Sequence, residues 1–347
     1  MTEVKKKLGG TVSYDEEGFR MSTPQAIARY KAERLKTKTV ADLGAGIGIQ
    51  ALSFAEVSEW VIAVEIDGKR TESLRKNAET AGTKNLEIVL GDALDSEVVR
   101  KLGNVDAIHS DPSRKKGGES WNFTDLSPNP LEVIKQYRCD TFSFDLPALF
   151  PLEMIPEEWE VEYVSLSGEL KRIGTYLGGA RRFQKSVVTL PSMERIIARK
   201  DLSRTVDVAQ LPSKWIYDLD GSIYHSKMIP EFLKTFDGLS LLHQDRQKTL
   251  LTGEKLRSSS FLIRTYSVLD HAASINEVKS RLIEQGAGNV VLRFSIDPSQ
   301  YYEERRNIRK GLEGTKTIYI FRFNSKYDLP ARDRRAIPQQ ESNRALL

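Results

Sequence analysis

Short apolar runs alternate with helical patterns over residues 39–190 of the chain. Buried strands are predicted at four such runs, namely TVADL, WVIAVEI, NLEIVL and VDAIHS. Between them, helices are predicted at IQALSFAEV, KRTESLRKNAETAG and SEVVRKLG. Three later strands are expected at 140–147, 160–168 and 182–190, the last two antiparallel at the edge of the sheet. Because this alternation indicates βαβ units, we predict an α/β, Rossmann-like domain with a seven-stranded, mainly parallel sheet.

The pattern changes in the second half of the chain. Strands are predicted at FLIRTYSVLD, NVVLRFSID and KTIYIFRF, and helices at SINEVKSRLIEQG and PSQYYEERRNIRKGL, which Gly286 and Gly311 would end. This β-α-β-α-β order predicts a smaller α+β domain of the split, ferredoxin-like type. WIYDLDGSIYH, at 215–225, fits either a hairpin or a loop. The expected divisions are an arm or lid over 1–38, domains over 39–192 and 193–328, and a tail over 329–347.

Composition limits the classes of protein that the chain can represent. The 347 residues are 39% hydrophobic and 29% charged, which is typical of a globular protein with room for two domains. No apolar run approaches the ~20 residues that span a bilayer. No apolar run follows the cations of MTEVKKKLGG either, so we expect no secretory signal, no membrane partner and a cytoplasmic location. Monomers are favoured.

Cysteine, histidine and net charge narrow the chemistry further. Cys139 is the only cysteine, which excludes an internal disulfide and a multi-cysteine zinc site. The four histidines, His109, His225, His243 and His271, have no metal-ligand spacing, so no metal is expected. A net charge of +4 permits an acidic partner such as RNA without requiring one.

A glycine-rich turn follows the first strand. In TVADLGAGIG, Asp42 precedes Gly44, Gly46 and Gly48, which recur at every second residue. Dinucleotide folds prefer G-x-G-x-x-G, which wraps a pyrophosphate. A carboxylate at Asp42 would repel a pyrophosphate but could bind an ammonium group. The spacing therefore favours the methionine moiety of S-adenosylmethionine over NAD.

Two more acids follow the next two strands. Glu65 and Ile66 end the second strand, where a carboxylate can accept hydrogen bonds from both ribose hydroxyls. Asp92 and Ala93 follow the third strand, where an acceptor can bind an adenine amino group. Each acid alone could be a solvated strand end. Because parallel strands end at one edge of the sheet, together they predict a cofactor site there.

The fourth strand ends in DPSRKKGGESW, at 111–121. Asp111, Pro112, Ser113 and Arg114 are expected to form the catalytic turn, which holds a target nitrogen while proline stiffens the backbone. Arg114, Lys115 and Lys116 would face an acidic or guanine-containing partner. Trp121 or Phe123 would offer a stacking surface, with loop packing as the simpler alternative. Asp145, at the end of the fifth strand, would lie on the substrate side with Pro147.

The series DLGAGIG, VEID and GDAL resembles class I S-adenosylmethionine-dependent methyltransferases over residues 15–190. GFRMSTPQAIARY, at 18–30, is similar to the approach to this domain in trimethylguanosine synthases. DPSRK and the segment from WIYDLDGSIYH onward more closely resemble methyltransferases with a THUMP-like C-terminal domain, in which DPARR-type motifs occur. The resemblance implies S-adenosyl-L-methionine as cofactor, a lid formed by Phe19, Thr23 and Pro24, and binding of structured RNA by the second domain.

Carbon methylation of a pyrimidine needs a cysteine nucleophile. DPSR also resembles the DPPR of tRNA uracil-5 methyltransferases, whose cysteine follows the fifth strand. Here Cys139 precedes that strand, about 16–20 Å from the site at ~3.3 Å per residue. Cys139 is therefore interpreted as a buried structural thiol, and His109 as buried scaffold.

The absence of a suitably placed cysteine predicts direct, non-covalent transfer to a nitrogen. The resemblances, together with Arg114, imply that the target is a guanine nitrogen, N7 or N2, in tRNA. The alternative is a methyltransferase for a small molecule or a protein, with the second domain serving for dimerisation, since a cofactor site does not specify a substrate.

Overall fold

The computed structural model describes residues 23–114, 122–199, 205–245, 248–323 and 326–332, which form two compact units. The first unit ends at Ala198, and the second consists of the chain from Arg199 together with Ser167–Glu169. The sequence places the domain boundary at 192. Strand β11 (Glu194–Ile197) still pairs within the first sheet, so the boundary lies behind that strand.

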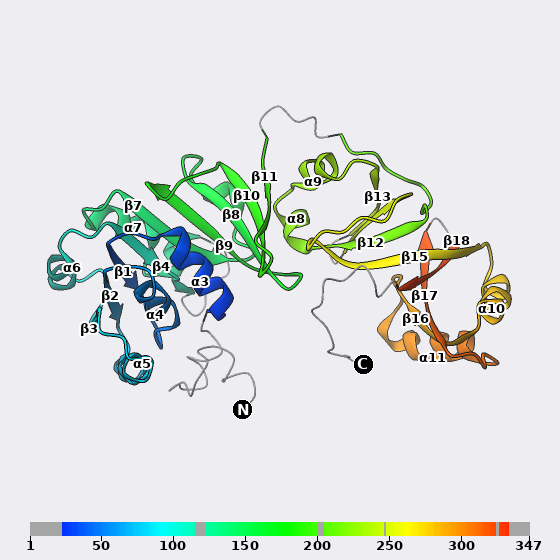
Figure 1. Ribbon diagram of the computed structural model, residues 1–347, viewed down its shortest axis with the longest axis horizontal. Coiled ribbons are helices and arrows are strands. Elements are labelled where there is room, and N and C mark those ends of the chain that lie inside the picture. Colours follow the sequence, from blue (N-terminus) through cyan, green and yellow to red (C-terminus); the bar gives the residue numbers. More distant parts are fainter. Residues whose placement is uncertain (1–22, 115–121, 200–204, 246–247, 324–325, 333–347) are drawn as a thin grey trace. The chain divides into compact units, whose positions relative to one another are not determined.

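One half of the first sheet is parallel and follows the predicted strands (Figure 1). Its order is β3-β2-β1-β4-β7, and every neighbouring pair runs parallel. Its members are β1 (Thr39–Leu43), β2 (Trp60–Glu65), β3 (Leu86–Leu90), β4 (Ala107–Ser110) and β7 (Thr141–Pro147). The apolar runs form these strands because helices cover the sheet and bury them, as Val40, Val61 and Ala107 show.

The other half of the sheet departs from the prediction. It continues β9-β8-β10-β11, which gives nine strands rather than seven. Strand β9 (Glu169–Gly178) is antiparallel to β7, whereas β8 (Glu160–Leu166) and β10 (Lys185–Leu190) are parallel to each other, so their expected antiparallel pairing is wrong. The sequence missed β9 because Lys171 and Arg172 make it look like a solvated basic segment.

The predicted helices of this unit are confirmed as α4 (Ile49–Ala55), α5 (Gly68–Ala81) and α6 (Ser96–Leu102). Aspartates begin two of them: Asp67 accepts hydrogen bonds from the amides of Lys69 and Arg70, and Asp95 accepts one from Glu97. Two further helices, α3 (Gln25–Arg34) and α7 (Pro130–Gln136), were not predicted.

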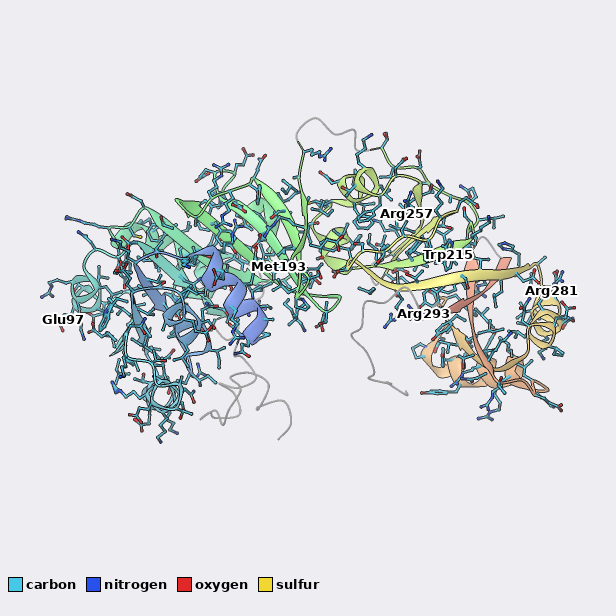
Figure 2. All side chains as sticks on the ribbon, viewed as in Figure 1. Glu97, Met193, Trp215, Arg257, Arg281 and Arg293 are labelled. Carbon is cyan, nitrogen blue, oxygen red and sulfur yellow. The ribbon has the colours of Figure 1, made fainter. Side chains whose placement is uncertain are left out.

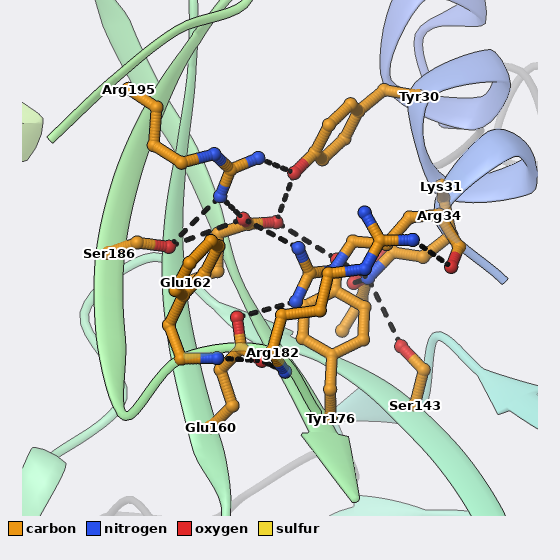
Figure 3. A network of polar contacts seen from close by, with 12 residues as sticks. Tyr30, Lys31, Arg34, Ser143, Glu160, Glu162, Tyr176, Arg182, Ser186 and Arg195 are labelled. Carbon is orange, nitrogen blue, oxygen red and sulfur yellow. Dashed lines mark hydrogen bonds and ion pairs between the residues drawn. The ribbon is translucent and has the colours of Figure 1, made fainter. Parts of the chain in front are cut away.

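Helix α3 is fixed to the sheet by a buried polar network (Figure 3). Its Tyr30 donates a hydrogen bond to Glu162 of β8 at 2.7 Å, and its Arg34 contacts Glu160 at 2.5 Å. The Arg34 guanidinium also lies over the Tyr176 ring, 3.8 Å from the centroid. Because Glu160 and Glu162 are fully buried, these cations and donors offset the cost of removing the two side chains from water.

The second unit contains one curved seven-stranded sheet of order β13-β14-β12-β15-β18-β17-β16. Two helices, α10 (Ile275–Glu284) and α11 (Pro298–Arg309), lie at the predicted positions between β15, β16 and β17. The strands are β12 (Trp215–Leu219), β13 (Leu239–Gln244), β14 (Thr249–Gly253), β15 (Leu262–Ala272), β16 (Ala287–Leu292), β17 (Lys316–Phe323) and β18 (Lys326–Arg332).

The ferredoxin-like interpretation of this unit is wrong. Strands β16 and β17 are parallel, and β18 pairs with both β15 and β17, which gives the order β-α-β-α-β-β rather than β-α-β-β-α-β. The expected tail at 329–347 begins inside β18. Residues 215–225 form neither a hairpin nor a loop but strand β12 followed by α8 (Gly221–His225). The unit also contains α9 (Ile229–Thr235).

Arginine side chains join distant strands of the second sheet. Arg293, which follows β16 and is labelled in Figure 2, contacts Asp218 of β12 at 2.7 Å. Arg264 of β15 reaches the same carboxylate at 3.0 Å. Among the described helices of either unit, none is long and apolar enough to cross a membrane.

Candidate functional site

A cavity of about 360 Å³ lies at the carboxyl ends of β1, β2, β3 and β4. The strand order changes direction at β1. Strands β2 and β3 lie on one side of β1, and β4 and β7 lie on the other. Ligands of open α/β sheets bind at such a switch point. The residues that line the cavity are Thr23, Asp42, Gly44, Ala45, Gly46, Ile47, Ile49, Gln50, Val64, Glu65, Ile66, Arg70, Gly91, Asp92, Ala93, Asp111, Pro112, Ser113, Arg114, Ser127, Pro128 and Pro147.

The glycine turn forms one wall. Gly44 and Gly46 have φ values of +79° and +59°, a region that side chains disfavour, and a Cβ on Gly46 would meet no protein atom within 4 Å. The Gly46 amide donates a hydrogen bond to Glu65 at 2.7 Å. Gly48 does not line the cavity. A Cβ there would lie 2.8 Å from Leu74, so this glycine allows α4 to pack closely against α5.

Asp42 lies at the base of the cavity with only 2% of its surface exposed. Its Oδ2 atom has no hydrogen-bond partner among the described residues. Burial raises the pKa of this carboxyl well above its usual value, and the nearby Asp111 and Glu65 carboxylates add to the rise. A buried carboxylate with one unpartnered oxygen at a cavity suits a cationic ligand group, which would restore its charged form.

The second and third acids stand along the same wall. Glu65 is buried and accepts hydrogen bonds from the amides of Gly46 and Asp67, which fix its orientation. Asp92 accepts one from Leu94, and Tyr137 donates to the Ala93 carbonyl at 2.6 Å. Ile66, which is 67% exposed, adds an apolar surface between these acids.

This donor set fits S-adenosylmethionine. Asp42 would hold its ammonium group, Glu65 its ribose hydroxyls, and Asp92 with Ile66 its adenine ring. Each carboxylate has further acceptor positions beyond the backbone bonds that orient it.

The fourth strand brings Asp111 to the opposite side of the cavity. Pro112, Ser113 and Arg114 follow it and also line the cavity. Strand β5 (Ser113–Arg114) pairs antiparallel with β6 (Leu126–Ser127). Ser127 of β6 therefore lines the cavity together with Ser113 and Arg114. The Asp111 side chain remains 37% exposed, so its carboxylate is accessible from the cavity.

Besides Gly48, three predicted residues lie away from the cavity. Phe123 is buried against Phe150 and Trp159, with ring centroids 5.1 and 5.5 Å away. This is the loop packing that was the alternative to a stacking surface. Asp145 is buried behind the cavity. Pro24 begins α3 without lining the cavity, whereas its neighbour Thr23 does line it. Phe19, Lys115, Lys116 and Trp121 lie outside the described residues.

Sequence reasoning missed the residue that contacts Asp111 most closely. Arg172 of β9 places Nη1 2.9 Å from the Asp111 Oδ2 atom. Arginine in a basic segment carries no signal of such a role, and the unpredicted strand β9 is what brings it there. Gln50 and Arg70 also line the cavity without having been predicted.

His109 and Cys139 lie away from the cavity. His109 is fully buried beside Phe54, and burial lowers its pKa to about 3, which fits the predicted scaffold role. Cys139 is only half-buried rather than buried, and burial raises the pKa of its thiol. Within the described ranges, no group of three or more His, Cys, Asp or Glu side chains could hold a metal ion.

Comparisons with known proteins relate the chain to methyltransferases by sequence and by fold. The family model "Ribosomal RNA adenine dimethylase" matches residues 24–117. An uncharacterized S-adenosylmethionine-dependent methyltransferase of Mycobacterium tuberculosis (strain H37Rv) is 22% identical over 319 residues, covering 88% of this chain and 83% of that protein. The crystal structure of a candidate methyltransferase from Porphyromonas gingivalis W83 has a TM-score of 0.74 at 17% identity, covering 96% and 88% of the two chains. The fold of both units therefore recurs in a solved structure.

Proposed function

We propose that this S-adenosylmethionine-dependent methyltransferase modifies a base nitrogen of RNA. The observation that carries the proposal is the placement of Asp111. Its part-exposed carboxylate shares one cavity with Asp42, Glu65 and Asp92, and it lies beyond the acids that would hold the cofactor.

In this proposal, one set of cavity residues binds the cofactor and Asp111 aligns the target nitrogen with the methyl group. S-adenosylmethionine, when bound, supplies a methyl group whose bond to sulfur breaks, with both electrons left on sulfur, as a nitrogen lone pair forms the new bond. Asp111 accepts a hydrogen bond from the target nitrogen and so orients that lone pair toward the methyl group. The N–H proton then leaves by way of the Asp111 carboxylate to water. Pro112 restricts the turn that holds Asp111.

RNA as substrate is supported by the family match and by the charges near the turn. The match to the ribosomal RNA adenine dimethylase model ends at residue 117, so it includes Asp111 and Arg114. Arg114 lines the cavity, and a guanidinium there can bind a base edge or a phosphate. The sequence predicts guanine N7 or N2 in tRNA as the target. Of these two nitrogens, only N2 carries the N–H group that would donate to Asp111, so we propose N2.

A second candidate substrate is an adenine amino group in ribosomal RNA. The match of residues 24–117 to an adenine dimethylase model favours it. The same Asp111 carboxylate would accept a hydrogen bond from the adenine amino group, so the proposed role of Asp111 applies to either base.

We assign RNA binding to the second unit as well. Lys248, Arg264 and Arg293 gather around Asp218, and Asp245 also lies beside Lys248, so three cationic groups accompany two carboxylates. Phosphate contacts by such groups release counterions, so affinity for RNA should fall steeply with salt.

A transfer assay tests the proposal. The protein is incubated with S-adenosylmethionine carrying a labelled methyl group and with total tRNA, ribosomal RNA, protein extract or small metabolites in parallel. We expect label in an RNA fraction and at least about 100-fold less in Asp111→Ala, because the target nitrogen loses its acceptor. Label confined to protein or metabolites would support the alternative substrate class instead.

A further inference from the structure

Arg172 joins the candidate catalytic carboxylate to a buried one. Its Nη1 atom lies 2.9 Å from Asp111 Oδ2 and 2.6 Å from Asp145 Oδ2, and its side chain is only 12% exposed. Thr23 adds a weaker hydrogen bond to the same Asp111 oxygen at 3.3 Å. Among the described residues, every recorded contact of the Asp111 carboxylate falls on Oδ2.

The guanidinium of Arg172 is held in turn by a second carboxylate, Asp145. Asp145 is fully buried and lies 2.7 Å from the Lys31 ammonium as well as 2.6 Å from Arg172. Although burial alone would raise the pKa of Asp145, the two cations lower it well below the usual value, so this carboxylate is charged at neutral pH. A charged Asp145 holds Arg172 in one position and thereby fixes the orientation of Asp111.

We propose that Arg172 is a positioning residue, which keeps Asp111 ionised and turns its Oδ1 atom toward the target nitrogen. This inference rests on the proposed function for its consequence, but the arrangement of Arg172 and Asp111 can be tested without a substrate. Burial raises the pKa of Asp111, and Arg172 opposes that rise. The nearby Asp145 charge adds to the rise, and the Thr23 hydrogen bond opposes it. Loss of the guanidinium therefore favours the protonated acid, in which one oxygen becomes a donor and the other is a weaker acceptor than a carboxylate oxygen.

An ionised carboxylate oxygen also selects among target nitrogens. It accepts a hydrogen bond from an N–H group and repels a bare lone pair. Guanine N2 and adenine N6 carry hydrogens, whereas guanine N7 carries only a lone pair in the plane of the ring. Arg172 therefore favours an exocyclic amino nitrogen as the target and disfavours N7.

A matched control exists in the same part of the sheet. Arg195 of β11 is also part-buried and contacts a buried carboxylate, Glu162, and the Tyr30 hydroxyl. It has no contact with Asp111 among the described residues. Arg195→Gln thus removes a comparable buried guanidinium without altering the environment of the catalytic turn.

The experiment measures the pKa of Asp111 by NMR in full-length protein with ¹³C-labelled aspartate carboxyls, the resonance being assigned with Asp111→Asn. We expect Arg172→Gln to raise this pKa by at least about one unit, a tenfold change in the proton equilibrium. Arg172→Lys should give a smaller rise, and Arg195→Gln none. In Arg172→Gln, Asp145 still pairs with Lys31, so the variant is expected to fold. If it does not fold, the Asp111 pKa in Arg172→Lys tests the inference instead.

The pH profile of methyl transfer provides the second readout. The acid limb of kcat/KM should move to higher pH in Arg172→Gln and return toward the parent position in Arg172→Lys. An unchanged Asp111 pKa in a folded Arg172 variant would overturn the inference, as would N7-methylguanosine as the product. A shifted pKa in a protein that labels no RNA would instead count against the proposed function and leave Arg172 as the group that controls Asp111.

Discussion

The Lys31 ammonium lies 2.7 Å from Asp145 Oδ1, and neither side chain is exposed to solvent. Complete burial lowers the pKa of Lys31, and Asp145 opposes that change. Removal of one partner from a buried pair typically costs about 3–5 kcal/mol, because the other charge is left in the interior. We expect Lys31→Met to lower the free energy of unfolding by this amount, as measured by urea denaturation.

The control for Lys31→Met lies on the same helix. Arg29 pairs with Glu56 at the surface, with both side chains more than half exposed. Exposed pairs contribute about 0–1 kcal/mol, so Arg29→Met should have little effect. Equal destabilisation by the two substitutions would show that Lys31 has no special structural role.

Asp42 should control cofactor affinity rather than stability. Its unpartnered Oδ2 atom is the expected acceptor for the ammonium group of S-adenosylmethionine. Asp42→Asn should weaken binding by about 10- to 100-fold, the equivalent of ~1.5–3 kcal/mol for a hydrogen bond to a charged group. Without ligand, the variant should be at least as stable as the parent, because a buried carboxylate has been replaced by a neutral group. Titration calorimetry tests the first expectation and thermal denaturation the second; undiminished affinity would show that the ammonium binds elsewhere.

Valine substitutions at Gly46 and Gly82 distinguish steric blocking of the cavity from the effect of backbone strain. Both have φ near +60°, and in both a Cβ would meet no protein atom within 4 Å, but only Gly46 lines the cavity. Gly46→Val and Gly82→Val should therefore cost similar stability. Only the first should abolish cofactor binding in an equilibrium binding assay. Parallel losses of affinity in both variants would attribute the effect to strain.

His109 should make stability depend on pH in mildly acidic solution. Its pKa is lowered from 6.5 to about 3 by burial, so between these values the unfolded chain binds a proton that the folded chain does not. Stability from this group is fully present above pH 6.5 and falls as the pH is lowered, by about 1.4 kcal/mol per unit. His109→Leu should flatten urea-derived stability between pH 4.5 and 7. A variant with the same slope as the parent protein would assign the dependence to other groups.

The strand ends of the first sheet could be predicted because parallel strands place successive turns at one edge. Asp42, Glu65, Asp92 and Asp111 accordingly line one cavity. What the sequence could not reveal is the cationic part of the site. Lys31 and Arg172 look like surface residues in any periodicity analysis, since only the fold brings their carboxylate partners near them.

The second unit shows a different limit. Its helices could be located because Ser274 and Asp297 cap them and Gly286 and Gly311 follow them. Its sheet order could not be predicted, because pairing depends on contacts between residues far apart in the chain. Strand β18, between β15 and β17, has polar and proline residues in place of an apolar run, and this concealed it.

The chemical identity of the methylated nucleoside shows which atom receives the methyl group. RNA methylated by the purified protein is digested to nucleosides and analysed by mass spectrometry against standards, with Asp111→Ala as the control. We predict a base methylated on an exocyclic amino nitrogen, in guanosine or adenosine, that is absent from the control. A methyl group on guanine N7, on a ring carbon or on ribose, or RNA without any added methyl group, would contradict this prediction.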